Sequence, residues 1–202
     1  LKEPSGHGMN VLWPWQLATR APAAVLAIAV SGVNWALVMG LGPIYAERMA
    51  LSLSDITVFV SLAVAGGLLA QFPLGHWADH SSRAMVLSAM GAAGALACMG
   101  AFLVGAGEVW TLWVLAFVFG AMTFPIYAIA SAFLGESLEQ QERVAASAGM
   151  VWIFGLGATV GPFVGALAMA KAGPPALFAV AAVALGAMVI ALSLNPWAGN
   201  KD

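Results

Sequence analysis

Segments of about twenty residues with no charged side chain in their interior recur along the whole chain. A helix needs roughly 20 mostly apolar residues to cross the hydrocarbon core of a bilayer. Six segments meet this requirement: Ala21–Pro43, Asp55–Gly75, Ala84–Val104, Val109–Leu134, Val144–Ala170 and Pro174–Leu194. The pattern predicts an all-α membrane protein with six transmembrane helices and short loops of about 4–12 residues between them.

The alternative, a water-soluble helical bundle, conflicts with the composition. Only 8% of the residues are charged and 62% are hydrophobic, and the mean hydropathy is +0.93. Soluble domains carry about 25% charged residues, and their outer helices need a polar face. None of the six segments has such a face, so the bilayer is the expected solvent and lipid the expected surroundings.

Several functional classes find no support in the residues. The net charge is −2 and no basic patch is present, so a nucleic-acid partner is not expected. The single cysteine, Cys98, lies in the middle of a segment, where packing is its ordinary role. We found no metal-ligand cluster, nucleophile triad or phosphate-binding loop. The sequence therefore predicts no enzyme activity, no cofactor and no bound metal.

A weak internal repeat suggests how the six helices are organised. Pro43–Ala46 (PIYA) recurs as Pro125–Ala128, an offset of 82 residues. The offset predicts two units of three helices each, and an odd number of spans per unit makes the two units inverted relative to each other, as in many membrane proteins.

The ends of the chain and its orientation follow from the flanking residues. Residues 1–20 are interpreted as a linker, residues 21–194 as the six-helix bundle and residues 195–202 as a tail. With six spans, both termini and two of the loops share one side. The lysines and arginines on that side are Lys2, Arg20, Arg83, Arg143 and Lys201. Only Arg48 and Lys171 lie opposite, so the positive-inside rule predicts cytoplasmic termini in a multi-pass protein of the cell (inner) membrane.

The scarce ionisable groups gather between the second and third segments, in the stretch GHWADHSSRA. Gly75, Asp79 and Arg83 occupy its first, fifth and ninth positions. This spacing resembles the loop signature of the major facilitator superfamily, G-x-x-x-D-[R/K]-x-G-R-[R/K]. The departures from that signature are His80, Ser82 and Ala84. Because Asp79 and Arg83 are four residues apart, their side chains can also form an ion pair.

The resemblance extends from about Arg20 to Leu194 and carries several expectations. It implies half of a twelve-helix fold, the C-terminal half given the linker-like start, in which two six-helix bundles rock to move a small solute. Gly75, Asp79 and Arg83 would then belong to a cytoplasmic latch against a complementary six-helix half.

A glycine stripe in the fifth segment is a second point of similarity to this superfamily. Gly157, Gly161 and Gly165 follow one another at intervals of four, with Pro162 among them, similar to the G-x-x-x-G-P-x-x-G-G pattern of the family's antiporters. Ala166 replaces the last glycine. A stripe without side chains also permits close contact with a neighbouring helix. Both a coupling role and a packing role are therefore open.

In the family, the first helix of each three-helix unit lines the central cavity. On this basis the expected solute-binding residues are Asn34 and Trp35 in the first segment and Thr123 and Tyr127 in the fourth. All four lie near the middle of their segments. With no ionisable residue at that depth, we expect a neutral or amphiphilic solute. Two alternatives stay open: a six-helix chain acting as a homodimer, and a non-transporting scaffold for partner proteins.

Overall fold

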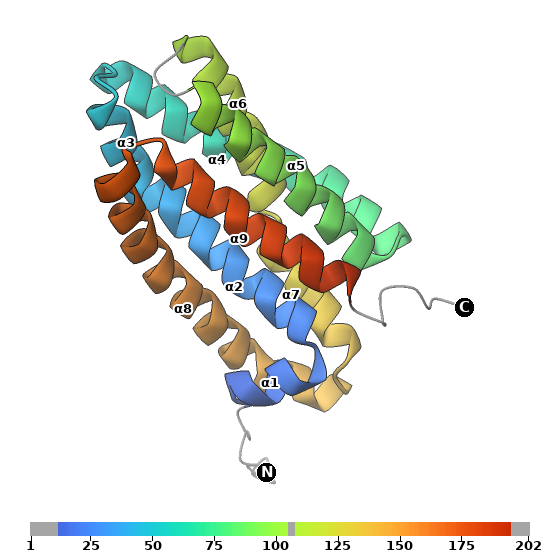
Figure 1. Cartoon of the computed structure of the whole chain (residues 1–202). Helices are drawn as coiled ribbons and strands as arrows, with labels where there is room; N and C mark the ends of the chain where they lie inside the picture. Colours follow the sequence, from blue (N-terminus) through green and yellow to red (C-terminus); the bar gives the residue numbers. More distant parts are fainter. Residues whose placement is uncertain (1–11, 105–107, 195–202) are drawn as a thin grey trace, which may run out of the picture.

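The computed structural model describes residues 12–104 and 108–194, which form a bundle of long helices (Figure 1). Six of the helical stretches are long and apolar enough to cross a membrane. They are Pro22–Arg48, Leu53–His80, Arg83–Val104, Val109–Glu136, Gln140–Ala172 and Ala176–Ser193. The all-α fold with six spans is therefore confirmed. The spans extend beyond several predicted segments because the helices continue past the apolar core into polar ends.

Two of the six spans are broken into pieces. The first span consists of α2 (Pro22–Ala36), a π-helical turn (Leu37–Leu41) and α3 (Gly42–Arg48). The fourth consists of α6 (Val109–Thr123) and α7 (Ile126–Glu136), with Pro125 at the start of α7. Proline has no backbone N–H to continue the helical ladder, which accounts for the second break.

The other four spans are continuous helices. They are α4 (Leu53–His80), α5 (Arg83–Val104), α8 (Gln140–Ala172) and α9 (Ala176–Ser193). Local signals set their ends. Ser52 and Asp55 form a reciprocal capping box at the start of α4. Gly173 ends α8 with φ of 88°, a backbone conformation that glycine adopts readily.

A short helix that the sequence did not predict precedes the bundle. This helix, α1 (Pro14–Arg20), packs against α2 and α8 at one end of the molecule (Figure 1). It lies within the segment interpreted as a linker. Residues 1–11 and the predicted tail at 195–202 lie outside the described residues.

The helix packing has the symmetry of an inverted repeat. α2 of the first span packs along α8 of the fifth, and α4 of the second packs along α6 of the fourth. α5 and α9, the third and sixth spans, pack on each other. Exchanging the first three spans with the last three converts the α2–α8 pair into the α4–α6 pair. The same exchange returns the α5–α9 pair to itself. The two three-helix units predicted from the sequence are therefore present.

Glycines allow two backbones to touch where α2 crosses α8. A side chain at Gly32 would overlap the carbonyl oxygen of Phe154, and one at Gly157 would overlap the carbonyl oxygen of Ala29. Each helix thus contributes a glycine that admits the other helix's backbone, the close packing that small residues permit in membranes.

The crossing of α4 and α6 repeats this arrangement. A side chain at Gly120 would overlap the carbonyl oxygen of Ala63, and one at Gly66 would overlap that of Phe117. The residues that correspond at the two crossings are Ala29 and Phe117, Gly32 and Gly120, Ala63 and Phe154, and Gly66 and Gly157. The shift is 88 residues from the first span to the fourth and 91 from the second to the fifth.

This geometry corrects the repeat offset of 82 residues inferred from the PIYA sequences. A shift of 88 residues places Leu37, where the π-helical turn begins, opposite Pro125, where the fourth span is broken. The two broken helices therefore break at equivalent positions of the two repeats. Pro43 and Pro125, which the sequence match aligned, are not equivalent.

Candidate functional site

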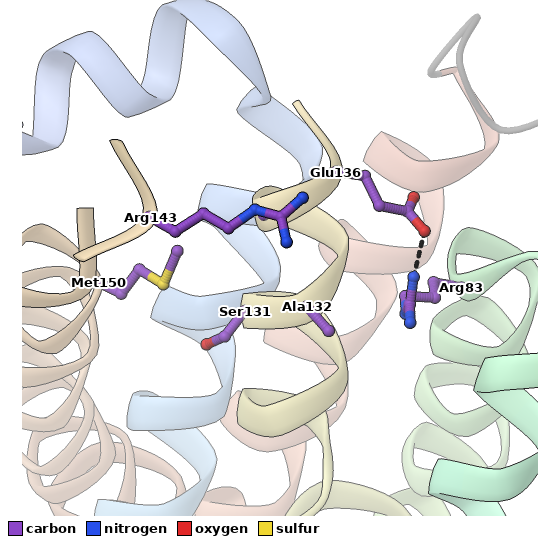
Figure 2. Close-up of a pocket in the computed structure, with 7 residues that line it drawn as sticks. Arg83, Ser131, Ala132, Glu136, Arg143 and Met150 are labelled. Carbon is purple, nitrogen blue, oxygen red and sulfur yellow. Dashed lines mark hydrogen bonds and ion pairs between the residues drawn. The ribbon is translucent and has the colours of Figure 1, made fainter. Parts of the chain in front are cut away.

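Arg83 joins three helices at the end of the bundle that also carries α1. It is the first residue of α5 and donates from Nη2 to Oδ1 of Asp79 over 3.2 Å. Its Nη1 donates to Oε1 of Glu136, the last residue of α7 (Figure 2). The Asp79–Arg83 pair expected from the spacing is thus present. Through Glu136, Arg83 also ties the second and third spans to the fourth.

Gly75 and Asp79 lie in the last two turns of α4. A Cβ atom at Gly75 would meet no atom of a neighbouring helix within 4 Å. The Asp79 side chain is 67% exposed even though it pairs with Arg83. Both residues therefore face outward from this bundle, which leaves their surface free for another element.

A pocket of about 370 Å³ opens between α7, α8 and the start of α5. Its charged walls are Arg83, Glu136 and Arg143, and Figure 2 shows the Arg143 side chain extending from α8 toward α7. Ser131 lines the same pocket with a buried hydroxyl that has no hydrogen-bond partner among the described residues. α7 and α8 are thus separated at this end by a polar space.

A second ion pair secures α1 to the same end of the bundle. Arg20 donates from Nη1 to both carboxylate oxygens of Glu142, each over 2.8 Å. The backbone N–H of Leu12 donates to the carbonyl oxygen of Ala145 over 3.3 Å, and the Leu17 side chain is buried next to Gly149. Together these contacts attach the segment before the first span to the first turns of α8.

Three aromatic rings from three spans meet at mid-depth. Trp35 of α2 lies 6.1 Å from Phe154 of α8, measured between ring centroids. Tyr127 of α7 lies 5.3 Å from the same ring in an edge-to-face arrangement. Trp35 is 46% exposed, and Tyr127 and Phe154 are half-buried. The structure therefore brings Trp35 and Tyr127 onto one open surface, with Phe154 between them.

Asn34 and Thr123, the other two predicted solute-binding residues, are buried within the bundle. Asn34 donates from Nδ2 to the carbonyl oxygen of Val30 over 2.9 Å, and its Oδ1 has no partner among the described residues. Thr123 donates to the carbonyl oxygen of Phe119 over 2.8 Å. Both residues lie just before the break in their helix.

The glycine stripe of α8 faces the first span along its whole length. A side chain at Gly161 would come within 2.9 Å of the carbonyl oxygen of Val33. One at Gly165 would come within 2.5 Å of the Leu37 side chain. The packing role of the stripe is therefore visible in the structure. Pro162 lies inside the continuous helix α8 and next to Gly40 of the π-helical turn.

Two residues of these sites were missed by sequence reasoning. Glu136 was not among the residues predicted from the sequence, but it is a partner of Arg83. Phe154 was not considered, because a phenylalanine in an apolar helix gives no signal of its own. For Glu136 a signal existed, since a carboxylate at the end of an apolar helix can satisfy a nearby arginine.

The fold and these sites define a half-size bundle of the facilitator type, and comparison with known proteins agrees. The family model described as Major Facilitator Superfamily matches residues 24–198. The chain belongs to this superfamily.

The relatives are similar at a distance. An uncharacterised MFS-type transporter of Enterobacter sp. (strain 638) is 28% identical over 163 residues, which are 81% of this chain and 41% of that protein. Another, from Yersinia pestis (strain Pestoides F), is 25% identical over 170 residues, 83% of this chain and 42% of the relative. YcaD of Salmonella paratyphi B is 26% identical over 155 residues, 74% and 38% of the two chains. The chain thus spans about two fifths of the relatives' length. No solved structure matches it.

Proposed function

We propose that the chain forms one half of a secondary transporter that moves a small solute by alternating access. The observation that carries the proposal is the position of the two helix breaks. The first and fourth spans break at equivalent places, and α2 and α7 pack on each other. The exposed ring of Trp35 and the half-buried rings of Tyr127 and Phe154 lie near the breaks at mid-depth. Broken helices near the midplane are a common feature of transporter binding sites.

The proposed solute surface is built from Trp35 and Tyr127, with Phe154 as their shared neighbour. Asn34 and Thr123 are buried just before the two helix breaks, and the unpartnered Oδ1 of Asn34 is an acceptor for water or for a solute group that reaches it. Rings with one polar tip suit a neutral or amphiphilic solute.

The complementary half of the transporter would cover the outward faces of α4 and α8. These two spans are the least buried in the bundle. Large apolar side chains such as Phe72, Trp152 and Phe163 are exposed on them. A second half from the same polypeptide or from another subunit would support the two-half transporter. A second copy of this chain in that place would support the homodimer alternative. A chain held by an unrelated protein on this face would favour the scaffold alternative.

The Asp79–Arg83–Glu136 network is the proposed gate, and Gly75 is where the second half would approach it.

The chain's orientation supports a cytoplasmic location for the gate. Arg20, Arg83 and Arg143 lie at the end of the bundle that carries α1, whereas Arg48 and Lys171 lie at the other end. A green fluorescent protein fused after Asp202 should therefore fluoresce, and alkaline phosphatase fused at the same point should be inactive. The reverse result would place this end outside the cell.

Cysteine labelling tests the proposed cavity without knowledge of the solute. Cys98 is the only cysteine in these 202 residues and is buried, so Cys98→Ala, together with replacement of every cysteine in the second half, gives a clean background. In the complete transporter, Trp35→Cys should react with a membrane-impermeant maleimide because alternating access wets this position. Reaction with Tyr127→Cys should follow the same pattern.

Leu96→Cys is the matched control for this experiment. Leu96 is 74% exposed near the middle of α5, and we expect it to face lipid, where the maleimide does not reach. Equal labelling at Trp35→Cys and Leu96→Cys, or none at Trp35→Cys, would contradict a water-filled cavity at the aromatic rings.

A further inference from the structure

Two histidines share an exposed face at the end of α4. His76 and His80 are four residues apart, and their ring centroids lie 4.3 Å from each other. Both side chains are exposed to the surroundings of the bundle. Phe72, one turn earlier, lies 6.4 Å from His76 with its ring nearly parallel. The two imidazoles therefore stand side by side, and the proposed gate does not use either of them.

The tautomer of His80 follows from its hydrogen bond. Its Nδ1 lies 2.9 Å from the carbonyl oxygen of His76. A carbonyl oxygen only accepts, so Nδ1 carries the proton and Nε2 of the neutral ring carries a free lone pair. Metal-binding histidines usually have this arrangement, in which one ring nitrogen donates to a carbonyl and the other coordinates the metal.

We propose that His76 and His80 chelate one divalent transition-metal ion at the end of α4. Histidines at positions i and i+4 of a helix point the same way and can hold one ion together. Imidazole nitrogen suits Zn²⁺, Ni²⁺ and Cu²⁺, whereas Mg²⁺ and Ca²⁺ prefer oxygen ligands. Water completes the coordination, because no group of three His, Cys, Asp or Glu side chains occurs among the described residues.

The site is separate from the ion pairs beside it. Asp79 lies between the two histidines in sequence, but its Oδ1 accepts from Arg83. Arg83 in turn is held by Glu136. One oxygen of the Asp79 carboxylate is thus engaged by Arg83, and the two imidazoles are the proposed ligands. The inference does not depend on what the chain transports.

Titration calorimetry with Ni²⁺ on the full chain, purified without a histidine tag, tests the proposal. We expect one ion per chain and no binding heat with Mg²⁺. His76→Ala and His80→Ala should each weaken Ni²⁺ binding by more than about tenfold, since even the loss of a supporting partner of a ligand costs that much. His7→Ala removes the one other histidine of the chain and should leave Ni²⁺ binding unchanged.

Folding does not confound this comparison. Both side chains are exposed, and the carbonyl of residue 76 remains in His76→Ala, so circular dichroism spectra should match the unsubstituted chain. Binding that survives either substitution in α4, binding lost in His7→Ala, or one ion shared by two chains would each overturn the proposal. With Cu²⁺, electron paramagnetic resonance should show two coordinated nitrogens, and a single nitrogen would also overturn it.

Discussion

Gly157→Leu is expected to destroy the contact between the first and fifth spans and to leave no active transporter. The new side chain would overlap the carbonyl oxygen of Ala29, which is part of the α2 backbone. Overfilling a packed site costs about 1–3 kcal/mol when neighbouring side chains can shift. Because a backbone cannot move aside without disturbing its helix, the cost here should exceed that range. The melting temperature of the purified chain and solute flux by the complete transporter measure the effect.

Gly186→Leu provides the matched control. It makes the same substitution in α9, where a Cβ atom at Gly186 would meet no atom of a neighbouring helix within 4 Å. We expect a melting temperature close to that of the unsubstituted chain. Gly120→Leu should repeat the Gly157→Leu result, because its side chain would overlap the backbone of Ala63 at the equivalent crossing. Similar melting temperatures for Gly157→Leu and Gly186→Leu would contradict the packing described for α2 and α8.

The number of spans could be predicted from the sequence because lipid imposes a simple requirement. Every spanning helix needs an apolar run of a certain length, and charged residues interrupt such runs only at the loops. The breaks within the first and fourth spans were not predicted. Leu37–Leu41 is as apolar as its surroundings, and Pro43 follows it at the start of α3. Prolines also lie inside the continuous helices α4 and α8, so a proline alone does not predict a break.

The repeat was recognised, but its register was not. The chain contains 23 glycines, so matches between glycines occur at many offsets by chance. What distinguishes Gly32 and Gly120 from the others is the backbone that each one touches. That property depends on how the helices cross and becomes visible only in the structure.

Some contacts of the candidate sites could be predicted from the sequence and others could not. The Asp79–Arg83 pair follows from a spacing of four on neighbouring helix ends. The Arg83–Glu136 pair joins residues 53 positions apart, and only the packing of the third span against the fourth brings them together. Trp35 and Tyr127 were each predicted from the family resemblance and from their depth, whereas their common neighbour Phe154 required knowledge of how the fifth span packs.

Arg83→Ala is expected to reduce solute flux by about tenfold or more while the bundle stays folded. An ion pair near the protein surface contributes about 0–1 kcal/mol to stability, so the melting temperature should change little. The Arg83 side chain is only 20% exposed, and it neutralises two carboxylates from different spans. Removing it takes away the positive charge that lies between Asp79 and Glu136 at the proposed gate. A coupling of 1–3 kcal/mol between gate and access state corresponds to a change of about 5–150-fold.

Two further variants separate a gating role from the loss of a charge. Arg48→Ala removes a guanidinium from the last turn of α3, at the opposite end of the bundle, and should leave flux unchanged. Glu136→Gln combined with Arg83→Ala should recover part of the lost flux, because the substituted gate then carries one fewer negative charge. Unsubstituted flux in Arg83→Ala would remove Arg83 from the gate. An equal loss of membrane-inserted protein and of flux would show that the network holds the helices together rather than controlling access.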